Sequence, residues 1–138
     1  DYPILYRDEV VSERVMEITN GQGVEVVYDS VGKDTFEDSL KCLKRLGMMV
    51  SFGQSSGKVP PVTLAQLAPG AYFLTRPSIF TYNATREELL ASAGELFDVL
   101  KSGIVKIDIT ATYPLADAAK AHDDLEGRKT NGSIVFTV

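Results

Sequence analysis

Four polar residues and one glycine stand where the chain is expected to leave a buried strand. They are Tyr6, Ser30, Gly53, Gln54 and Ser55. The strands before them are predicted at Ile4–Tyr6, Val24–Tyr28 and Met48–Phe52, which are short and largely apolar. Parallel strands end at the same edge of a sheet, so we expect these five residues to share one edge. Ligands of open α/β sheets bind at that edge, beyond the carboxyl ends of the strands. Hydroxyl and amide groups there suit the ribose and amide groups of a nucleotide, and they equally suit ordinary turns.

Three other residues could carry chemistry, but a structural role is favoured for each. Asp29 could be a general acid or base, although a carboxylate at a strand end more often holds the next turn. Cys42 lies in a stretch expected to pack on the sheet, which favours a buried thiol over a nucleophile. His122 has no cysteine or second histidine near it in the sequence, so we expect no metal site. No residue is predicted to be catalytic.

The glycine-rich stretches do not match a phosphate-binding motif. The pair Gly21 and Gly23 lacks the third glycine of a dinucleotide fingerprint and precedes a strand instead of following one. The run Gly53–Lys58 is one residue short of a Walker motif, and Val59 stands where a hydroxyl should bind magnesium. The expected nucleotide edge therefore has no glycine fingerprint of its own.

A strand, a helix and a second strand between Val24 and Phe52 should position these residues. Asp34 with Glu37 forms a capping-box pattern, and Phe36, Leu40 and Leu43 form one apolar stripe of a helix that Gly47 is expected to end. Connections this short predict a right-handed crossover between two parallel strands.

The remaining elements follow from the same signals of periodicity and capping. We expect a helix over residues 8–19, a helical turn at Thr63–Leu67, extended structure at Ala71–Leu74 and Ile79–Tyr82, a helix from Thr85 to Gly103, a strand over Val105–Tyr113, a helix over Ala116–Glu126 and a strand at Ile134–Phe136. The alternation after Gly103 differs from the buried runs before it. A boundary between two structural units is therefore predicted near Gly103.

The bulk composition is that of a globular protein. The chain has 138 residues, 44% of them hydrophobic and 24% charged, with a net charge of −5. This charge argues against a nucleic-acid interface, and no apolar run is long enough to span a membrane. One cysteine gives no internal disulfide, so a cytoplasmic location is expected. The chain begins with Asp1, partway into an α/β pattern.

Three stretches together resemble the bacterial NADPH:quinone oxidoreductases, the zinc-independent, zeta-crystallin-like branch of the medium-chain dehydrogenase/reductases. These stretches are Val27–Gly32, Met49–Gly57 and Leu74–Ser78, and Ala118–Gly132 is similar to the closing helix and turn of that family. The resemblance covers essentially the whole chain. It implies the carboxyl-terminal fragment of a two-domain enzyme.

The implied fold is the carboxyl-terminal part of a doubly wound, Rossmann-type parallel sheet. Residues 1–103 would form the second half of the NADPH-binding domain, and residues 104–138 would return to a GroES-like catalytic domain. The missing portion would hold most of the catalytic domain and the glycine fingerprint, so the fragment alone is expected to be inactive.

The resemblance also implies roles for residues at the cofactor site. Tyr6 would lie near the ribose phosphate of the adenosine, and Ser30 would line the adenosine side. The residues matching segments at the nicotinamide end are Gly53, Gln54, Ser55, Thr75, Arg76, Pro77 and Ser78. Arg128 matches an arginine that reaches the cofactor, whereas Gln54 replaces the smaller amide expected at its position.

The reaction implied is hydride transfer from NADPH to a quinone without metal. The resemblance further implies a homodimer formed through the strand Ala71–Tyr82. This aromatic edge carries a charge only at Arg76 in its middle, and nothing later in the chain is expected to cover it. Two alternatives remain open: a related NADPH-dependent enoyl or alkenal reductase, and a self-contained flavodoxin-like or receiver-like nucleotide-binding module.

Overall fold

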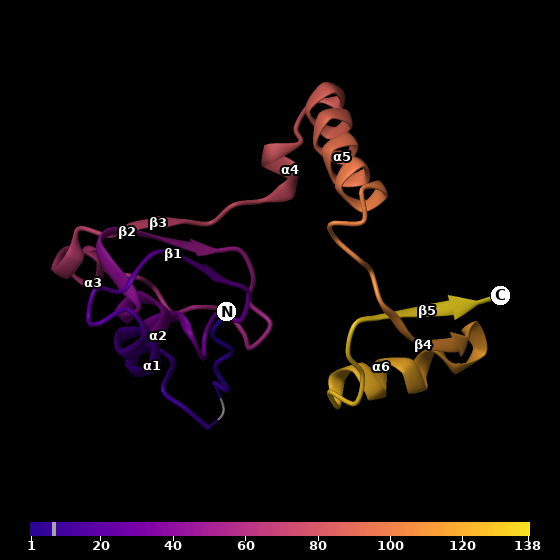
Figure 1. Cartoon of the computed structure of the whole chain (residues 1–138), viewed down its shortest axis with the longest axis horizontal. Coiled ribbons are helices and arrows are strands. Elements are labelled where there is room, and N and C mark those ends of the chain that lie inside the picture. The colour runs from indigo at the N-terminus through magenta and orange to yellow at the C-terminus, as the bar shows by residue number, and fades with distance from the viewer. Residues whose placement is uncertain (7) are drawn as a thin grey trace. The chain divides into compact units, whose positions relative to one another are not determined.

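The computed structural model describes residues 1–6 and 8–138, which form two compact units, Asp1–Ala84 and Thr85–Val138. The first unit contains α1 (Val11–Ile18), β1 (Val24–Asp29), α2 (Phe36–Lys41), β2 (Leu43–Ser51), α3 (Leu64–Leu67), the 3-10 helix η1 (Ala68–Gly70), β3 (Phe73–Thr75) and α4 (Ile79–Tyr82) (Figure 1). The second unit contains α5 (Arg86–Lys101), β4 (Ile109–Pro114), the 3-10 helix η2 (Leu115–Asp117), α6 (Ala118–Glu126) and β5 (Ser133–Thr137).

The sheet of the first unit is parallel, with the strand order β1-β2-β3. Val27 pairs with Met49, and Met49 pairs with Leu74, so neighbouring strands end at the same edge. The parallel pair β1 and β2 is connected through α2, which confirms the predicted strand–helix–strand unit. The α/β fold class with parallel sheets is likewise confirmed.

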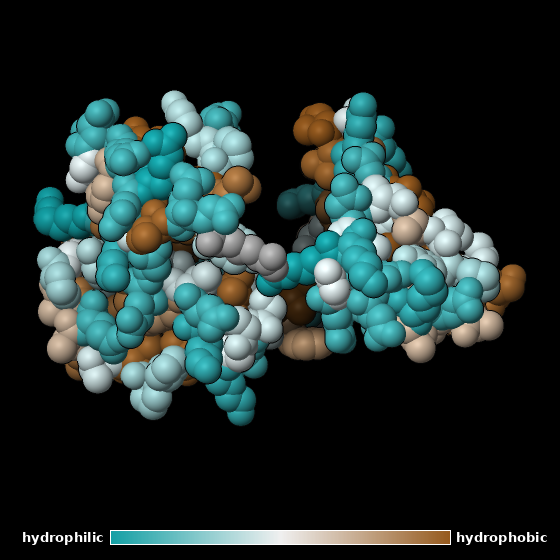
Figure 2. Space-filling view, turned by 90° about the horizontal axis from the view of Figure 1, so that it is seen from below, coloured by the Kyte–Doolittle hydropathy of each residue, from teal (hydrophilic) through white to brown (hydrophobic). Residues whose placement is uncertain are grey.

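The core of this unit lies between the sheet and the helices α1 and α2, which Figure 1 shows on one side of the sheet. Its buried members are Phe36 and Leu40 from α2 and Leu43 and Met49 from β2. Asp38 of α2 accepts hydrogen bonds from Ser12 of α1, and the other charged residues of these two helices are exposed. Hydrophilic residues cover most of the face seen from below in Figure 2. Burial of the apolar side chains thus fixes α2 against β1 and β2.

The boundary between α2 and β2 differs from the prediction. Thr35, not Asp34, is the N-cap of α2, and the helix ends at Lys41. Leu43 therefore belongs to β2, where it pairs with Val24, although it still reaches the core beside Phe36 as expected. The apolar spacing was correct, but it does not distinguish one more helical turn from the start of a strand.

Gly47 is a residue within β2 and not the helix terminator that we expected. A β-bulge in β2 separates the pairs Val24–Leu43 and Val26–Met48, and Leu46 has a positive φ of 62°. A Cβ atom on Gly47 would lie 2.8 Å from the carbonyl oxygen of Lys44. The glycine is therefore required because the bulge folds the backbone close to itself.

The segment Ile79–Tyr82 is the helix α4, whereas its aromatic and β-branched residues predicted extended structure. The N–H groups of Thr81 and Tyr82 donate to the carbonyl of Ser78 at 3.0 and 3.1 Å. These local bonds use the donors that a sheet ladder would need, so strand propensity is overridden. The strand before it is also shorter than expected, because β3 starts at Phe73 after Ala71 adopts a left-handed conformation.

Two further strand predictions are wrong, the first entirely and the second in its first residues. Ile4–Tyr6 forms no strand; Asp8 N donates to Leu5 O at 2.7 Å, which makes a turn. β4 begins at Ile109 and not at Val105, because its parallel partner β5 pairs with it only from Ser133 onward. The apolar run at Ile4–Tyr6 and the alternation before Ile109 both suggested strands, but no described strand pairs with either segment.

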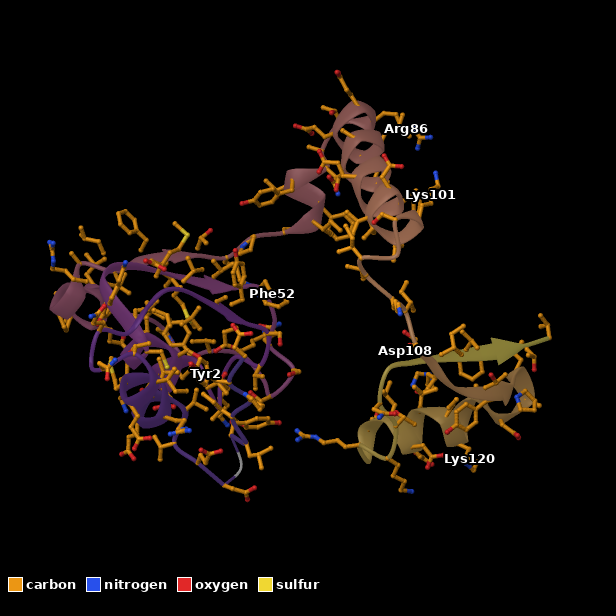
Figure 3. All side chains as sticks on the ribbon, in the orientation of Figure 1. Tyr2, Phe52, Arg86, Lys101, Asp108 and Lys120 are labelled. Carbon is orange, nitrogen blue, oxygen red and sulfur yellow. The ribbon has the colours of Figure 1, made fainter. Side chains whose placement is uncertain are left out.

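The second unit contains a parallel pair, β4 and β5, connected through α6. Asp124 on α6 accepts hydrogen bonds from Tyr113 Oη on β4 (3.1 Å), from Lys120 Nζ (2.6 Å) and from Lys129 Nζ (3.2 Å). Figure 3 labels Lys120 on α6. In α5 the predicted capping box is confirmed, because Thr85 Oγ1 accepts from Glu88 N at 3.2 Å.

Candidate functional site

The candidate site is the carboxyl edge of the parallel sheet, and its central group is the Asp29 carboxylate. Asp29 is the last residue of β1 and is 4% exposed. Its Oδ1 accepts from the N–H groups of Val31 (2.7 Å) and Gly32 (2.9 Å). Its Oδ2 accepts from the hydroxyls of Thr35 (2.7 Å) and Ser39 (2.9 Å) on the α2 side. This side chain holds the turn after β1 and joins it to α2, as the sequence favoured.

The same contacts decide the charge of Asp29. Burial by itself raises the pKa of this carboxyl group, but the hydrogen bonds from Gly32, Thr35, Ser39 and Val31 outweigh burial, and the pKa is lowered from its ordinary 3.8. The group is therefore an ionised acceptor at neutral pH. With four donors already on its two oxygens, it is a poor general acid or base.

The turn after β1 is joined directly to the turn after β2. The carbonyl of Asp29 accepts from the N–H groups of Phe52 (2.9 Å) and Gly53 (3.2 Å), and Ser55 N donates to Ser30 O at 3.3 Å. A Cβ atom on Gly53 would lie 2.2 Å from the Ser30 carbonyl oxygen, so no larger residue fits there without movement. The structure therefore brings Ser30, Gly53 and Ser55 together, as predicted.

Gln54 lies in the same paired turn. A Cβ atom on Gly32 would lie 2.9 Å from the Cα of Gln54, which shows how closely the two backbones approach. The side chains of Ser30, Gln54 and Ser55 are all exposed. The paired turns thus present hydroxyl and amide groups to solvent at one edge of the sheet.

The segment after β3 completes this edge. Thr75 is the last residue of β3, and Arg76 Nη1 donates to the carbonyl of Ser51, at the end of β2, over 2.7 Å. Phe52 follows Ser51 at the end to which the strands point (Figure 3). A hollow of about 450 Å³ is lined by Phe52, Arg76, Pro77, Ser78, Ile79, Phe80 and Tyr82. Three of the predicted residues, Arg76, Pro77 and Ser78, therefore share one concave surface.

Two predicted site residues are placed elsewhere. Tyr6 lies in the turn before α1 and is half exposed, so it does not end a strand of the described sheet. Arg128 belongs to the second unit, where it follows α6 with a positive φ of 55°. Because the two units are described separately, the grouping of Arg128 with the paired turns stays a prediction. The role of Tyr6, which lies in the same unit as these turns, also stays a prediction.

The Cys42 thiol adds no nucleophile to the site. Cys42 is buried, its Sγ lies 3.3 Å from Asp38 O, and burial together with the Asp38 charge raises its pKa to about 11. A thiol with that pKa is protonated at neutral pH, which agrees with a structural role. Within residues 1–6 and 8–138, no group of three or more histidine, cysteine, aspartate or glutamate residues could hold a metal ion.

Three residues that shape the site were missed from the sequence: Thr35, Ser39 and Ser56. Thr35 and Ser39 follow Asp29 at spacings of six and ten residues, and a hydroxyl on the first turn of the next helix is the signal that could have found them. Ser56 had no such signal, because its partners Val31 and Asp34 belong to the other turn. Only the packing of two turns brings it to them.

The parallel sheet, the helices packed on it and the polar turns at its carboxyl edge define an α/β protein of the Rossmann-like class. Comparison with known families then gives a more specific result. The chain belongs to the zinc-binding dehydrogenase family, whose family model matches residues 1–136.

Several curated relatives are named as oxidoreductases or reductases. The chain is 53% identical over 133 residues to quinone oxidoreductase 1 of Escherichia coli, covering 94% of this chain and 41% of the relative. It is 41% identical over 137 residues to a 2-haloacrylate reductase of a Burkholderia species, covering 98% of this chain and 41% of the relative. The chain therefore spans about two fifths of the length of these relatives.

Solved structures agree in fold. The chain is similar to the crystal structure of E. coli quinone oxidoreductase complexed with NADPH, with a TM-score of 0.91 and 51% identity over 98% of this chain and 42% of that one. It is also similar to the crystal structure of 2-haloacrylate reductase, with a TM-score of 0.82 and 42% identity over 94% of this chain and 41% of that one. These matches do not favour a flavodoxin-like module.

Proposed function

We propose that this chain is the NADPH-binding part of an oxidoreductase that transfers hydride from NADPH to a quinone without a catalytic metal. The observation that carries the proposal is the paired turn at the carboxyl edge, Asp29–Gly32 with Gly53–Gly57, in a chain 53% identical to a quinone oxidoreductase. Residues 1–103 would belong to the NADPH-binding domain and residues 104–138 to the catalytic domain. The enzyme would work in the cytoplasm.

The residues present fit a dinucleotide. Gly53 and Gly32 let two backbones approach closely, which leaves the exposed hydroxyl and amide groups of Ser30, Gln54 and Ser55 along one edge. Arg76 is held by the Ser51 carbonyl beside the hollow, where its positive charge suits an anionic or electron-rich ligand. Bound at this edge, NADPH would supply the hydride.

The protein's own residues would bind and orient the cofactor. In the proposal Ser30 lies on the adenosine side, and the nicotinamide end runs past two segments, Gly53–Ser55 and Thr75–Ser78. Tyr6 contacts the ribose phosphate, and Arg128 reaches the cofactor from the second unit. Asp29 is engaged by four donors and is therefore poorly suited to act as an acid or base at this edge.

The direct test is a cofactor titration of the full-length protein that contains this chain. Fluorescence titration should show tighter binding of NADPH than of NADH. Tyr6→Ala should weaken NADPH about two- to tenfold more than NADH, the size of one or two lost hydrogen bonds. Equal losses for both cofactors would remove Tyr6 from the phosphate site, and no binding of either cofactor would overturn the proposal.

A second candidate is reduction of an activated carbon–carbon double bond. It is supported by the 41% identity to a 2-haloacrylate reductase and agrees with the enoyl or alkenal alternative. NADPH oxidation by the full-length protein, followed with a simple quinone and with 2-chloroacrylate at equal concentrations, separates the two. A higher kcat/KM for the haloacrylate would favour the second candidate.

We also propose a homodimer formed through the edge of β3. In the described sheet β3 is the last strand and pairs with β2 only. Phe73 and Leu74 of β3 are exposed. Two-fold pairing of identical strands would join two sheets and cover both edges. The contribution of residues 79–82 would be helical and not a continuation of the strand.

A further inference from the structure

Ser56 links the two turns of the candidate site through three hydrogen bonds. Its N–H donates to the carbonyl oxygen of Val31 at 2.9 Å, and its hydroxyl donates to the same oxygen at 2.8 Å. The hydroxyl also accepts from Asp34 N at 3.0 Å. One side chain of the second turn therefore spans the first turn from Val31 to Asp34.

The other links between the two turns are single backbone bonds. Where the turns begin, Phe52 N and Gly53 N reach Asp29 O at 2.9 and 3.2 Å. Further along, Ser55 N reaches Ser30 O at 3.3 Å and Lys33 N reaches Gly57 O at 3.2 Å, both near the long limit for N–H···O bonds. The Ser56 hydroxyl adds two side-chain hydrogen bonds to these long backbone bonds, one with Val31 and one with Asp34. Without the Ser56 hydroxyl, residues 55–57 of the second turn would be held to the first turn mainly by long backbone bonds.

We propose that Ser56 is a positioning residue for the cofactor, whose hydroxyl sets the distance between Ser30 on one turn and Gln54 and Ser55 on the other. This inference rests on the proposed function, in which those three residues line the NADPH site. Ser56 itself acts through the turn and needs no contact with the cofactor. The separation of the two lining segments is the quantity that it controls.

The test uses the full-length protein and three variants. Ser56→Ala removes the hydroxyl and keeps the N–H bond to Val31, whereas Ser56→Thr retains a hydroxyl. Ser102→Ala is the matched control, because the Ser102 hydroxyl also donates to a carbonyl (Val99 O, 2.7 Å) and accepts from an N–H (Ile104, 3.4 Å), but in the second unit after α5.

Steady-state kinetics with varied NADPH should separate positioning from general damage. Ser56→Ala should raise KM for NADPH about three- to tenfold with kcat nearly unchanged, because ground-state and transition-state binding are lost together. Ser56→Thr should restore most of the affinity, and Ser102→Ala should leave KM unchanged. An unchanged KM in Ser56→Ala, or an equal rise in Ser102→Ala, would overturn the proposal.

Amide hydrogen exchange without cofactor tests whether Ser56 links the two turns, independently of the proposed function. Ser56→Ala should accelerate exchange in residues 31–34 and 54–57 together, while Ser102→Ala changes neither segment. Acceleration confined to residues 54–57 would overturn the coupling of the turns. If the wild-type protein binds no NADPH while the coupled exchange is seen, the proposed function fails and the link through Ser56 stands.

Discussion

At the scale of single residues, Asp29 explains how a buried carboxylate can be stable at the edge of this sheet. An unpaired buried charge is costly, but here two N–H groups and two hydroxyls surround the two oxygens. Its carbonyl is also used, by Phe52 and Gly53 of the neighbouring turn. One residue thus organises two turns through its side chain and its backbone, which makes its role structural.

Asp29→Asn should reduce the pH dependence of stability. The folded-state pKa lies below the ordinary 3.8, so the unfolded chain binds more protons between the two pKa values, and stability falls as pH falls. The contribution of Asp29 is complete above pH 3.8 and is lost as pH falls through the folded-state pKa. Urea unfolding at several pH values should show wild type and variant converging in acid. A gap that widens in acid would contradict this assignment.

Gly53→Ala should destabilise the protein, since the added Cβ would lie 2.2 Å from the Ser30 carbonyl oxygen. Forcing an extra methyl group into so close a backbone approach costs roughly 1–3 kcal/mol. Gly94→Ala in α5 is the control: no atom lies within 4 Å of its new Cβ, and alanine in a helix stabilises by about 0.5–1 kcal/mol. Urea unfolding should show a lower free energy of unfolding for Gly53→Ala and a higher one for Gly94→Ala, each relative to wild type.

At the scale of elements, the second unit is held by a side-chain cluster between β4 and α6. Asp124 accepts from Tyr113 on the strand and from Lys120 and Lys129 around the helix end. The hydrogen bond from Lys120, then that from Lys129, lowers the Asp124 pKa to about 2. Lys120 Nζ also lies 5.1 Å from the centroid of the Tyr113 ring. The carboxylate therefore connects one strand to one helix.

Asp124→Asn should lower the thermal midpoint of the protein. The amide keeps the size of the side chain but loses the charge that both lysines share, so the link between β4 and α6 weakens. The loss should shrink in high salt, because both lysines are largely exposed and their charges are screened. Calorimetry at low and high salt makes the measurement.

Asp98→Asn is the control for this change. Asp98 pairs with Lys101 at 3.8 Å, and both side chains are 79% exposed. An exposed pair of this kind contributes little to stability, so the midpoint should not move at either salt concentration. Equal shifts in the two variants would show that Asp124 acts only as one more surface charge.

At the scale of the whole molecule, the chain spans 41% of the length of its quinone oxidoreductase relatives. None of the described helices is long and apolar enough to cross a lipid bilayer. The apolar side chains of α5 and of residues 104–109 are widely exposed in this structure, including Leu96, Phe97 and Ile104. The unit Thr85–Val138 therefore buries little of its apolar surface by itself.

The isolated chain should show no quinone reductase activity. Residues 1–138 contain no glycine fingerprint and span 41% of the length of the quinone oxidoreductase relative, so this chain by itself would not enclose cofactor and substrate. NADPH oxidation with a simple quinone should stay at the uncatalysed rate, with the full-length protein as the positive control. A turnover comparable to the full-length protein would contradict this expectation.

Phe80→Lys should shift the full-length protein toward monomer. Phe80 is 85% exposed on α4, which follows β3 in the segment proposed to form the homodimer, and a charge there would be costly to bury between two copies. Light scattering at micromolar concentration should show a dimer for wild type and a smaller mean mass for the variant. Tyr2→Lys, at another exposed aromatic, should leave the mass unchanged; a monomeric wild type would refute the homodimer.

The amino-acid sequence by itself determined the features that depend on neighbours along the chain. The capping box of Thr85 and Glu88, the end of α5 before Gly103 and the short helix after Thr63 were all predicted correctly. So was the gathering of Ser30, Gly53 and Ser55, because parallel strands joined by a helix must end at one edge. These outcomes rest on local hydrogen bonding and on topology.

Tertiary structure alone decided the features that depend on partners far apart in the sequence. Leu43 became a strand residue because Val24 pairs with it, whereas Ile79–Tyr82 became a helix because no described strand pairs with that segment. The link from Ser56 to Val31 spans 25 positions and follows no sequence pattern. A strand forms only where another strand pairs with it, and two turns join only where the fold packs them together. The residues of a segment do not by themselves specify such distant partners.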